Sequence, residues 1–192
     1  MVRENVDDDR TSSTTERDLL ERCRRGDRSA FDTIVAVHRL AVYRVARRIL
    51  GSHEAADEAT QETFVRAWRS LDGFRGEARL GTWLIRIALN VSRTLGARRS
   101  REAPLDAAAP FVDPLSSPEA LAALRESGRR LRRAVATLPP RQREVVALKV
   151  FSDMTYEDVA AAMGLSVGAV KAHFHQAVAN LRRRMIGDPA EG

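Results

Sequence analysis

Apolar residues recur at helical spacing in several stretches of this 192-residue chain, with polar residues between them. The first predicted helix spans about residues 15–25 and stops at Gly26. Asp27 or Ser29 opens a longer helix that closes at Gly51. Its apolar stripe comprises Phe31, Ile34, Val35, His38, Val42, Val45, Ala46 and Ile49.

The next predicted helix is capped by Ser52, extends to Trp68 and carries two unlike stripes. One stripe is apolar and should be buried: Ala56, Thr60, Thr63, Phe64, Ala67 and Leu71. The other is acidic but includes two apolar residues: Glu54, Asp57, Glu58, Gln61, Val65 and Trp68. A large aromatic side chain on a charged surface is typical of a docking site. The alternative is that Trp68 packs beneath the first helix.

A glycine-punctuated loop over Asp72–Gly81 leads into a helix predicted for Leu80–Arg99. Its apolar stripe comprises Leu84, Ile87, Ala88, Val91 and Leu95. The opposite face carries Arg86, Asn90 and Arg93, with Trp83 at its edge. Arginine, asparagine and an aromatic on one face suit phosphates and exposed bases. A simple solvated helix face is the alternative.

From Ser100 to about Pro118 the composition shifts to Pro, Ala, Ser and Asp, without a helical period. We therefore predict a linker at 100–118 between two helical domains at 15–99 and 119–186. Residues 1–14 form a disordered N-terminal tail in this scheme, and 187–192 form a C-terminal tail. No strand-like alternation of useful length occurs, so the expected fold is all-α.

The second domain ends in a predicted helix-turn-helix. Thr155 caps a short helix in a near capping box with Asp158, and Gly164–Ser166 form a tight turn into a longer helix. The inward positions of the two helices are Tyr156, Val159, Ala160, Met163, Val167, Val170, Phe174, Ala177, Leu181 and Met185. An ordinary helical hairpin is the alternative.

The outward positions of the longer helix suit a DNA major groove. Small residues near its start allow close approach to the groove floor, and polar residues further along reach bases and phosphates. The candidate contacts are Ser166, Gly168, Ala169, Lys171, Ala172, His173, His175, Gln176 and Arg183.

Composition places the chain among globular proteins, with 44% hydrophobic and 30% charged residues. No apolar run approaches the ~18 residues of a membrane span, and the N-terminus is unlike a signal peptide. We therefore expect a cytoplasmic protein without membrane insertion. The net charge of +6 favours a polyanionic partner, although only Lys149 and Lys171 are lysines and the arginine bias fits a GC-rich genome.

Catalytic and metal chemistry find no support in the sequence. Cys23 is the only cysteine, which excludes an intrachain disulfide and a multi-cysteine zinc site. His53 and Asp57 only distantly resemble a zinc-protease helix, and His173 and His175 point to different sides of a helix. No Walker loop, nucleophile elbow or triad is present. We expect no metal, no cofactor and no enzymatic activity.

Several segments resemble the extracytoplasmic-function (ECF) sigma factors of the sigma-70 family of bacterial RNA polymerase. The segments 57–68 (DEATQETFVRAW), 74–78 (FRGEA) and 82–90 (TWLIRIALN) resemble their domain 2. The segments 138–145 (LPPRQREV), 156–160 (YEDVA) and 164–171 (GLSVGAVK) resemble their domain 4. The match keeps the family's order and spacing across both domains and the linker.

The resemblance implies an alternative sigma factor that binds core RNA polymerase, recognises the −35 and −10 promoter elements, and helps to melt DNA without ATP. Docking on the polymerase clamp helices would fall to Asp57, Glu58, Gln61, Glu62, Val65 and Trp68. Contacts to the −10 element, with Phe74 stacking on a flipped base, would fall to Phe74, Arg75, Trp83, Arg86, Asn90 and Arg93. The duplex beside that element would meet Arg98 and Arg99.

Further implied partners are the −35 duplex, read by the helix from Ser166, and the polymerase flap, contacted by the preceding helices. An anti-sigma factor would hold the protein inactive and could sequester it at the membrane, and no homo-oligomer is required. His173 and Gln176 stand where family recognition helices often carry arginine, so the −35 sequence of relatives does not transfer.

Two other classes of protein remain open at this stage. A free-standing helix-turn-helix activator or repressor would need a dimerisation surface and paired half-sites. An adaptor that binds only proteins would leave the Arg86, Asn90 and Arg93 face unexplained.

Overall fold

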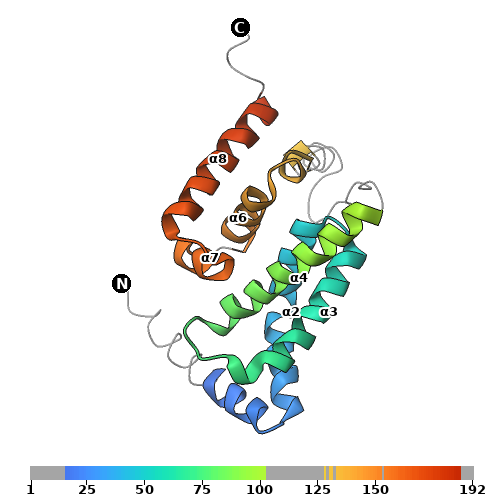
Figure 1. Cartoon of the computed structure of the whole chain (residues 1–192), viewed down its shortest axis with the longest axis vertical. Coiled ribbons are helices and arrows are strands. Elements are labelled where there is room, and N and C mark those ends of the chain that lie inside the picture. The colour runs from blue at the N-terminus through green and yellow to red at the C-terminus, as the bar shows by residue number, and fades with distance from the viewer. Residues whose placement is uncertain (1–15, 103–127, 129, 132, 153, 187–192) are drawn as a thin grey trace, which may run out of the picture.

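The computed structural model describes residues 16–102, 128, 130–131, 133–152 and 154–186. Within these residues every regular element is a helix, as the sequence predicts (Figure 1). The predicted tails at 1–14 and 187–192, and positions 103–118 of the predicted linker, lie outside the described residues.

The helices form two groups. The first group contains a helix at 16–24, α2 (Arg28–Leu50), α3 (His53–Ser70), the short 3₁₀ helix η1 (Leu71–Gly73) and α4 (Leu80–Glu102). The second group contains helical residues between 128 and 136, α6 (Pro140–Phe151), α7 (Tyr156–Met163) and α8 (Val167–Ile186). Since α4 continues to Glu102, it takes in the first residues of the predicted linker.

Side-chain caps are present at the helix starts that the sequence predicts. Asp27, rather than Ser29, caps α2 by accepting hydrogen bonds from the backbone N–H of Ser29 (2.9 Å) and Ala30 (3.3 Å). The α2 helix ends at Gly51, whose φ of 73° favours glycine. Ser52 then caps α3 through the N–H of Ala55.

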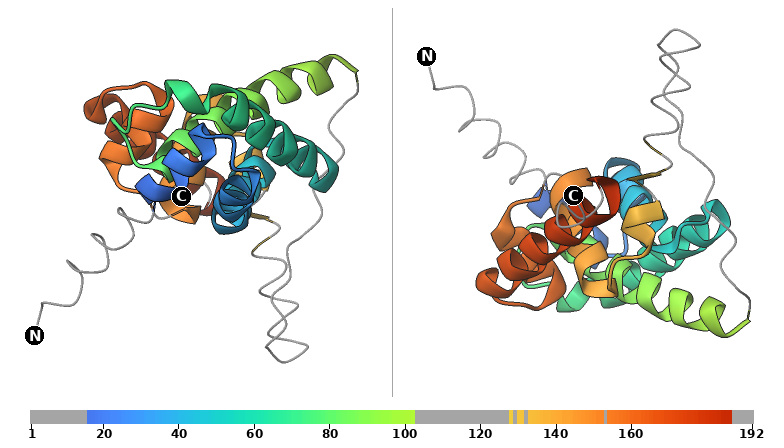
Figure 2. Two further views of the ribbon diagram at one scale, coloured as in Figure 1. Left: turned by 90° about the horizontal axis from the view of Figure 1, so that it is seen from below. Right: turned by 90° about the horizontal axis from the view of Figure 1, so that it is seen from above.

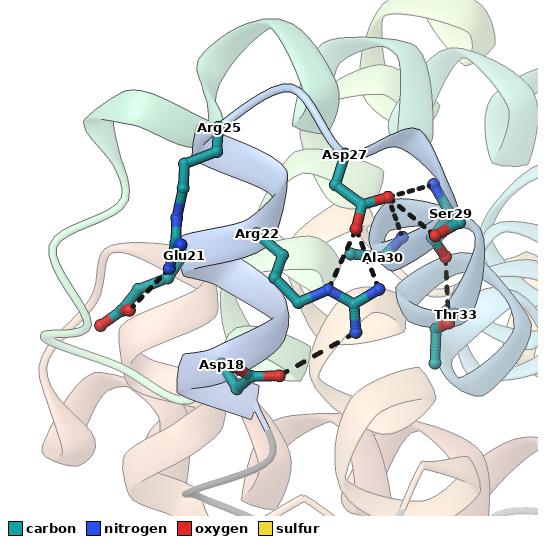
Figure 3. A network of polar contacts seen from close by, with 8 residues as sticks. All are labelled: Asp18, Glu21, Arg22, Arg25, Asp27, Ser29, Ala30 and Thr33. Carbon is teal, nitrogen blue, oxygen red and sulfur yellow. Dashed lines mark hydrogen bonds and ion pairs between the residues drawn. The ribbon is translucent and has the colours of Figure 1, made fainter.

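Asp27 also joins the first helix to α2 (Figure 3). Its Oδ2 accepts hydrogen bonds from Nε (3.0 Å) and Nη2 (2.9 Å) of Arg22, and its Oδ1 accepts one from the Ser29 hydroxyl at 2.7 Å. The Ser29 hydroxyl and the Arg22 guanidinium together lower the pKa of the Asp27 carboxyl from 3.8 to about 2. The folded protein thus keeps this carboxylate ionised at pH values where the unfolded chain protonates it.

The pKa of Asp27 predicts an acid-dependent contribution to stability. Because the folded pKa lies below the unfolded one, the contribution is complete well above pH 4 and is lost as the pH falls towards 2. Asp27→Asn keeps the helix cap but cannot titrate. We expect its melting temperature, followed by circular dichroism, to lie below that of the wild type at pH 7 and to converge with it towards pH 2. Ser29→Ala should give a smaller gap, and a gap that does not change with pH would contradict the assignment.

The core of the first group forms where α2, α3 and α4 pack against one another. The predicted stripes are largely confirmed, because α2 buries Ile34, Val42, Val45 and Ala46, and α3 buries Thr60, Thr63, Phe64 and Ala67. The predicted stripe of α4 is likewise buried, except that Ile87 is partly exposed.

The second group packs directly against the first (Figures 1 and 2). Helix α7 contacts α4 and helix α6 contacts α2, and one hydrophobic cluster joins Leu89 of α4 with Val145 of α6 and Val159 of α7. The C-terminal end of α4 projects away from this contact (Figure 2). The described residues therefore form a closed arrangement of the two groups.

Polar contacts also cross between the groups. Thr82 donates a hydrogen bond to Asp158 Oδ1 at 3.2 Å, and the Arg48 guanidinium lies 3.6 Å from the ring centroid of Phe151. Among the described residues, no helix is both long and apolar enough to cross a membrane.

Candidate protein-docking and nucleic-acid interfaces

The acidic stripe of α3 lies on the surface. Trp68 is 37% exposed and Val65 is 43% exposed, and Glu54, Asp57 and Gln61 are also exposed. The indole of Trp68 is therefore not buried. It packs edge-on against Phe31 of α2, with ring centroids 4.9 Å apart. This contact fixes the orientation of the indole while leaving part of it available to a partner.

Two carboxylates of this surface already have arginine partners. Glu62 accepts a hydrogen bond from Arg66 at 2.7 Å, and Glu58 accepts one from Arg98 of α4 at 2.9 Å, with Arg99 at 3.7 Å. All these side chains are substantially exposed, so each pair contributes little to stability and can exchange for contacts with a partner. The Glu58–Arg98 pair joins the two predicted binding surfaces, a link that the sequence did not reveal.

The loop before α4 buries the residue predicted to stack on a base. Phe74 is only 6% exposed, its ring centroid lies 4.9 Å from that of Trp83, and Arg24 donates a hydrogen bond to its carbonyl. Arg75 beside it is exposed. Stacking of a base on Phe74 stays a prediction, and it would require this aromatic pair to open.

The predicted polar face of α4 is divided. Arg86 and Asn90 are exposed, whereas Arg93 is held by the second group. Its Nε and Nη2 donate to the two carboxylate oxygens of Glu144 at 2.7 and 2.9 Å, and its Nη1 donates to Asn90 Oδ1 at 3.1 Å. Hydrogen bonding to the Glu144 carboxylate raises the pKa of Arg93. Two of the three side chains are thus open to solvent.

Helices α7 and α8 form the predicted helix-turn-helix (Figure 1). Thr155 accepts a hydrogen bond from the Asp158 N–H at 3.0 Å, Gly164 has a φ of 66°, and Ser166 accepts one from the Ala169 N–H at 3.2 Å. Phe174 packs edge-on against Tyr156 across the two helices. Cap, turn and inter-helix packing agree, so α8 is held firmly on α7.

The outward face of α8 is open. Of the candidate contacts, the exposed ones are Ser166, Gly168, Lys171, Ala172, His175, Gln176 and Arg183, while Ala169 and His173 are partly exposed. Behind this face the buried Gln142 donates to Gln176 Oε1 at 3.4 Å and accepts from Asn180 at 2.8 Å. Asn180 in turn accepts from Arg183 at 2.5 Å. The prediction that Met185 faces inward is wrong, since it is 42% exposed beside Arg130 and Arg133 near the end of α8.

The two helical groups coincide with two known families. Residues 34–102 match the family model of sigma-70 region 2, and residues 128–181 match that of sigma-70 region 4. The chain is 31% identical over 173 residues to the ECF RNA polymerase sigma-E factor of Salmonella typhimurium, covering 85% of this chain and 90% of the relative. The chain belongs to the ECF sigma factors.

Two solved structures share the fold of this sigma factor. CnrH, solved in complex with the cytosolic domain of CnrY, is 29% identical, with a TM-score of 0.69 over 91% of this chain and 99% of that one. The sigma factor RpoE of Bartonella quintana, solved in complex with the anti-sigma factor NepR, is 24% identical, with a TM-score of 0.67 over 82% of this chain and 98% of that one. The sequence prediction of an all-α alternative sigma factor is confirmed.

Two titratable side chains of this sigma factor lie away from the predicted interfaces. Burial raises the pKa of the Cys23 thiol, which favours its protonated form. Burial lowers the pKa of His38, whose Nε2 lies 4.0 Å from Glu16. Within the described part of the chain, no group of three His, Cys, Asp or Glu side chains could hold a metal ion.

The packing contact between the two regions of the sigma factor was not predicted from the sequence. Ile85 and Leu89 lie beside the predicted apolar stripe of α4 and are also buried. These two residues form a second apolar strip on α4. The strip could have indicated a second packing partner, because a helix with one packing partner needs only one apolar stripe. Nothing in the sequence pointed to Glu144 as the partner of Arg93.

Proposed function

We propose that residues 15–99 dock on core RNA polymerase and bind the −10 element, and that residues 119–186 read the −35 element. The observation that carries the proposal is that one sigma factor has both an exposed acidic and aromatic surface on α3 and an exposed outward face on α8. The protein is then a non-catalytic, dissociable subunit that works in the cytoplasm and needs no cofactor.

Docking on the clamp helices is assigned to the α3 surface. The anchor is Trp68, whose exposed part is oriented by Phe31, and the surrounding carboxylates would steer a basic partner and set its register. The assigned residues are Asp57, Glu58, Gln61, Glu62, Val65 and Trp68.

Promoter contacts are assigned to α4 with its preceding loop and to α8. Arg86, Asn90 and Arg93 hold the separated strand, with Arg75 from the loop, and Phe74 and Trp83 supply aromatic surface for a flipped base. In α8 the residues from Ser166 to Arg183 read the −35 duplex.

An anti-sigma factor is proposed as the regulator of this chain. The support is the similarity to RpoE, which was solved with the anti-sigma factor NepR. The closed arrangement of the two groups is compatible with a partner that covers both.

The test of the function is in vitro transcription with core RNA polymerase on a fragment library of the source genome, with and without the protein. We expect protein-dependent transcripts that share upstream elements about two helical turns apart. Absence of such transcripts, together with binding of the free protein to palindromic duplexes, would instead identify a helix-turn-helix regulator.

Trp68→Ala tests the docking surface. Because buried tryptophans dominate interface energies, we expect the affinity for core polymerase to fall about thirtyfold. Val37→Ala is the control, since Val37 is an exposed apolar residue on α2, outside the proposed surface. Affinity measured by fluorescence anisotropy that is the same for both variants would remove the assignment.

A further inference from the structure

The ion pair between Arg93 and Glu144 joins the two regions of the sigma factor. Glu144 is 2% exposed, and both its oxygens accept hydrogen bonds from the Arg93 guanidinium, at 2.7 and 2.9 Å. Arg141 adds a longer contact of 3.5 Å to the same carboxylate. A paired, charge-assisted contact of this kind is the geometry by which arginine also binds phosphate.

The position of Arg93 on α4 explains why the second group covers it. On a helix of 3.6 residues per turn, Thr82, Leu89 and Arg93 fall within about 40° of one another. Thr82 contacts Asp158 of α7, and Leu89 shares a hydrophobic cluster with α6 and α7. The second helical group therefore packs along the side of α4 that carries Thr82, Leu89 and Arg93. Of the proposed strand-binding residues of α4, Arg93 is the one that this group partly covers.

We propose that Glu144 is a built-in competitor of the nucleic-acid backbone, whose carboxylate occupies the Arg93 fork until a phosphate of the separated strand replaces it. The inference rests on the proposed binding of the −10 strand by α4. The closed arrangement and capture of the strand therefore compete for one guanidinium. Asn90 accepts from Arg93 Nη1 at 3.1 Å within α4, so this contact can orient the guanidinium before and after the exchange.

The dimensions of the promoter require such an opening. Two helical turns of DNA span about 70 Å, whereas a compact body of the described size has a radius of gyration of about 14 Å. Residues 103–127 connect the two groups, and a chain of that length reaches at most about 80 Å. Both elements can be bound together only after α6 and α7 leave α4, which breaks the Arg93–Glu144 pair.

Glu144→Gln tests the proposal in the full-length protein without polymerase. The probe is a fluorescein-labelled single-stranded dT 20-mer, and binding is followed by fluorescence anisotropy at several NaCl concentrations. We expect about tenfold tighter binding than the wild type, because a charge-assisted contact becomes available. The plot of log affinity against log salt should steepen by about 0.7, the value for one more phosphate contact on a single strand.

The matched control is Glu21→Gln. Glu21 forms an exposed pair with Arg25 on the first helix, so this variant has the same net charge as Glu144→Gln without touching α4. We expect its affinity and salt slope to stay at wild-type values. Adding Arg93→Ala to Glu144→Gln should abolish the gain. Equal curves for Glu144→Gln and Glu21→Gln would overturn the proposal.

A disulfide lock tests the same point from the opposite direction, by holding the two groups in the closed arrangement. Thr82→Cys combined with Asp158→Cys should cross-link α4 to α7 on oxidation, while Cys23 stays buried. The oxidised protein should bind the probe more weakly than the wild type and support little transcription, and dithiothreitol should restore both. Unchanged binding of the oxidised form would overturn the proposal. Failure of the wild-type protein to direct transcription would count against the proposed function instead.

Discussion

Replacing both Arg86 and Asn90 with alanine should reduce promoter-dependent transcription by this sigma factor about a hundredfold. Both side chains are exposed on α4, next to the covered Arg93. Contacts to a charged group contribute about 1.5–3 kcal/mol each, so loss of the pair should cost about 3 kcal/mol in the open complex. Arg93 is left in place because its loss would leave Glu144 buried without its bidentate partner.

Run-off transcription and permanganate footprinting of unpaired thymines measure this effect. Binding of the double variant to core polymerase should be unchanged, because α3 carries the proposed docking surface. Arg44→Ala is the control, since it removes one positive charge from the exposed face of α2. If Arg44→Ala loses as much transcription as the double variant, the effect is general electrostatics and the assignment to α4 fails.

Arg93→Ala should destabilise the protein by about 3 kcal/mol, more than Glu144→Gln does, because it leaves the buried Glu144 carboxylate with only its longer contact to Arg141, at 3.5 Å. The asymmetry follows from exposure. The Glu144 side chain is 3% exposed and cannot reach water, whereas the Arg93 side chain is 32% exposed and can be partly solvated after Glu144 is neutralised. Urea unfolding followed by circular dichroism measures both differences.

The control for this prediction is Arg93→Met combined with Glu144→Leu. Apolar side chains of similar size can replace a buried ion pair with little loss of stability. We expect the double variant to lie within about 1 kcal/mol of the wild type. A larger loss for Glu144→Gln than for Arg93→Ala would contradict the role given to burial.

Local chemistry made most of the helices predictable from the sequence. Ser52, Thr155 and Ser166 cap helices where they were expected to do so, because a cap depends on residues only three positions away. The exposed Trp68 surface was also foreseen, since periodicity on one helix separates its inner and outer faces.

Contacts between distant segments were not predictable in this way. Leu89 packs in a hydrophobic cluster with residues of α6 and α7. The periodicity of α4 shows that a second apolar strip exists, but it does not show which helices pack against that strip. The partner of Arg93 is 51 residues away, so the sequence around Glu144 gives no indication of this contact. Phe74 sits in a glycine-rich loop, and only the position of Trp83 shows that its ring is covered.

The contact of α4 with α7 has a consequence for how binding measurements on this protein should be interpreted. A partner that needs the two groups apart binds only the open fraction, so its apparent dissociation constant equals the intrinsic one divided by that fraction. If one molecule in a hundred is open, the apparent affinity is about a hundredfold weaker than the contacts themselves provide. Because both groups belong to one chain, dilution does not change this fraction. A substitution in the α4–α7 contact should therefore change the measured affinity for every such partner by the same factor.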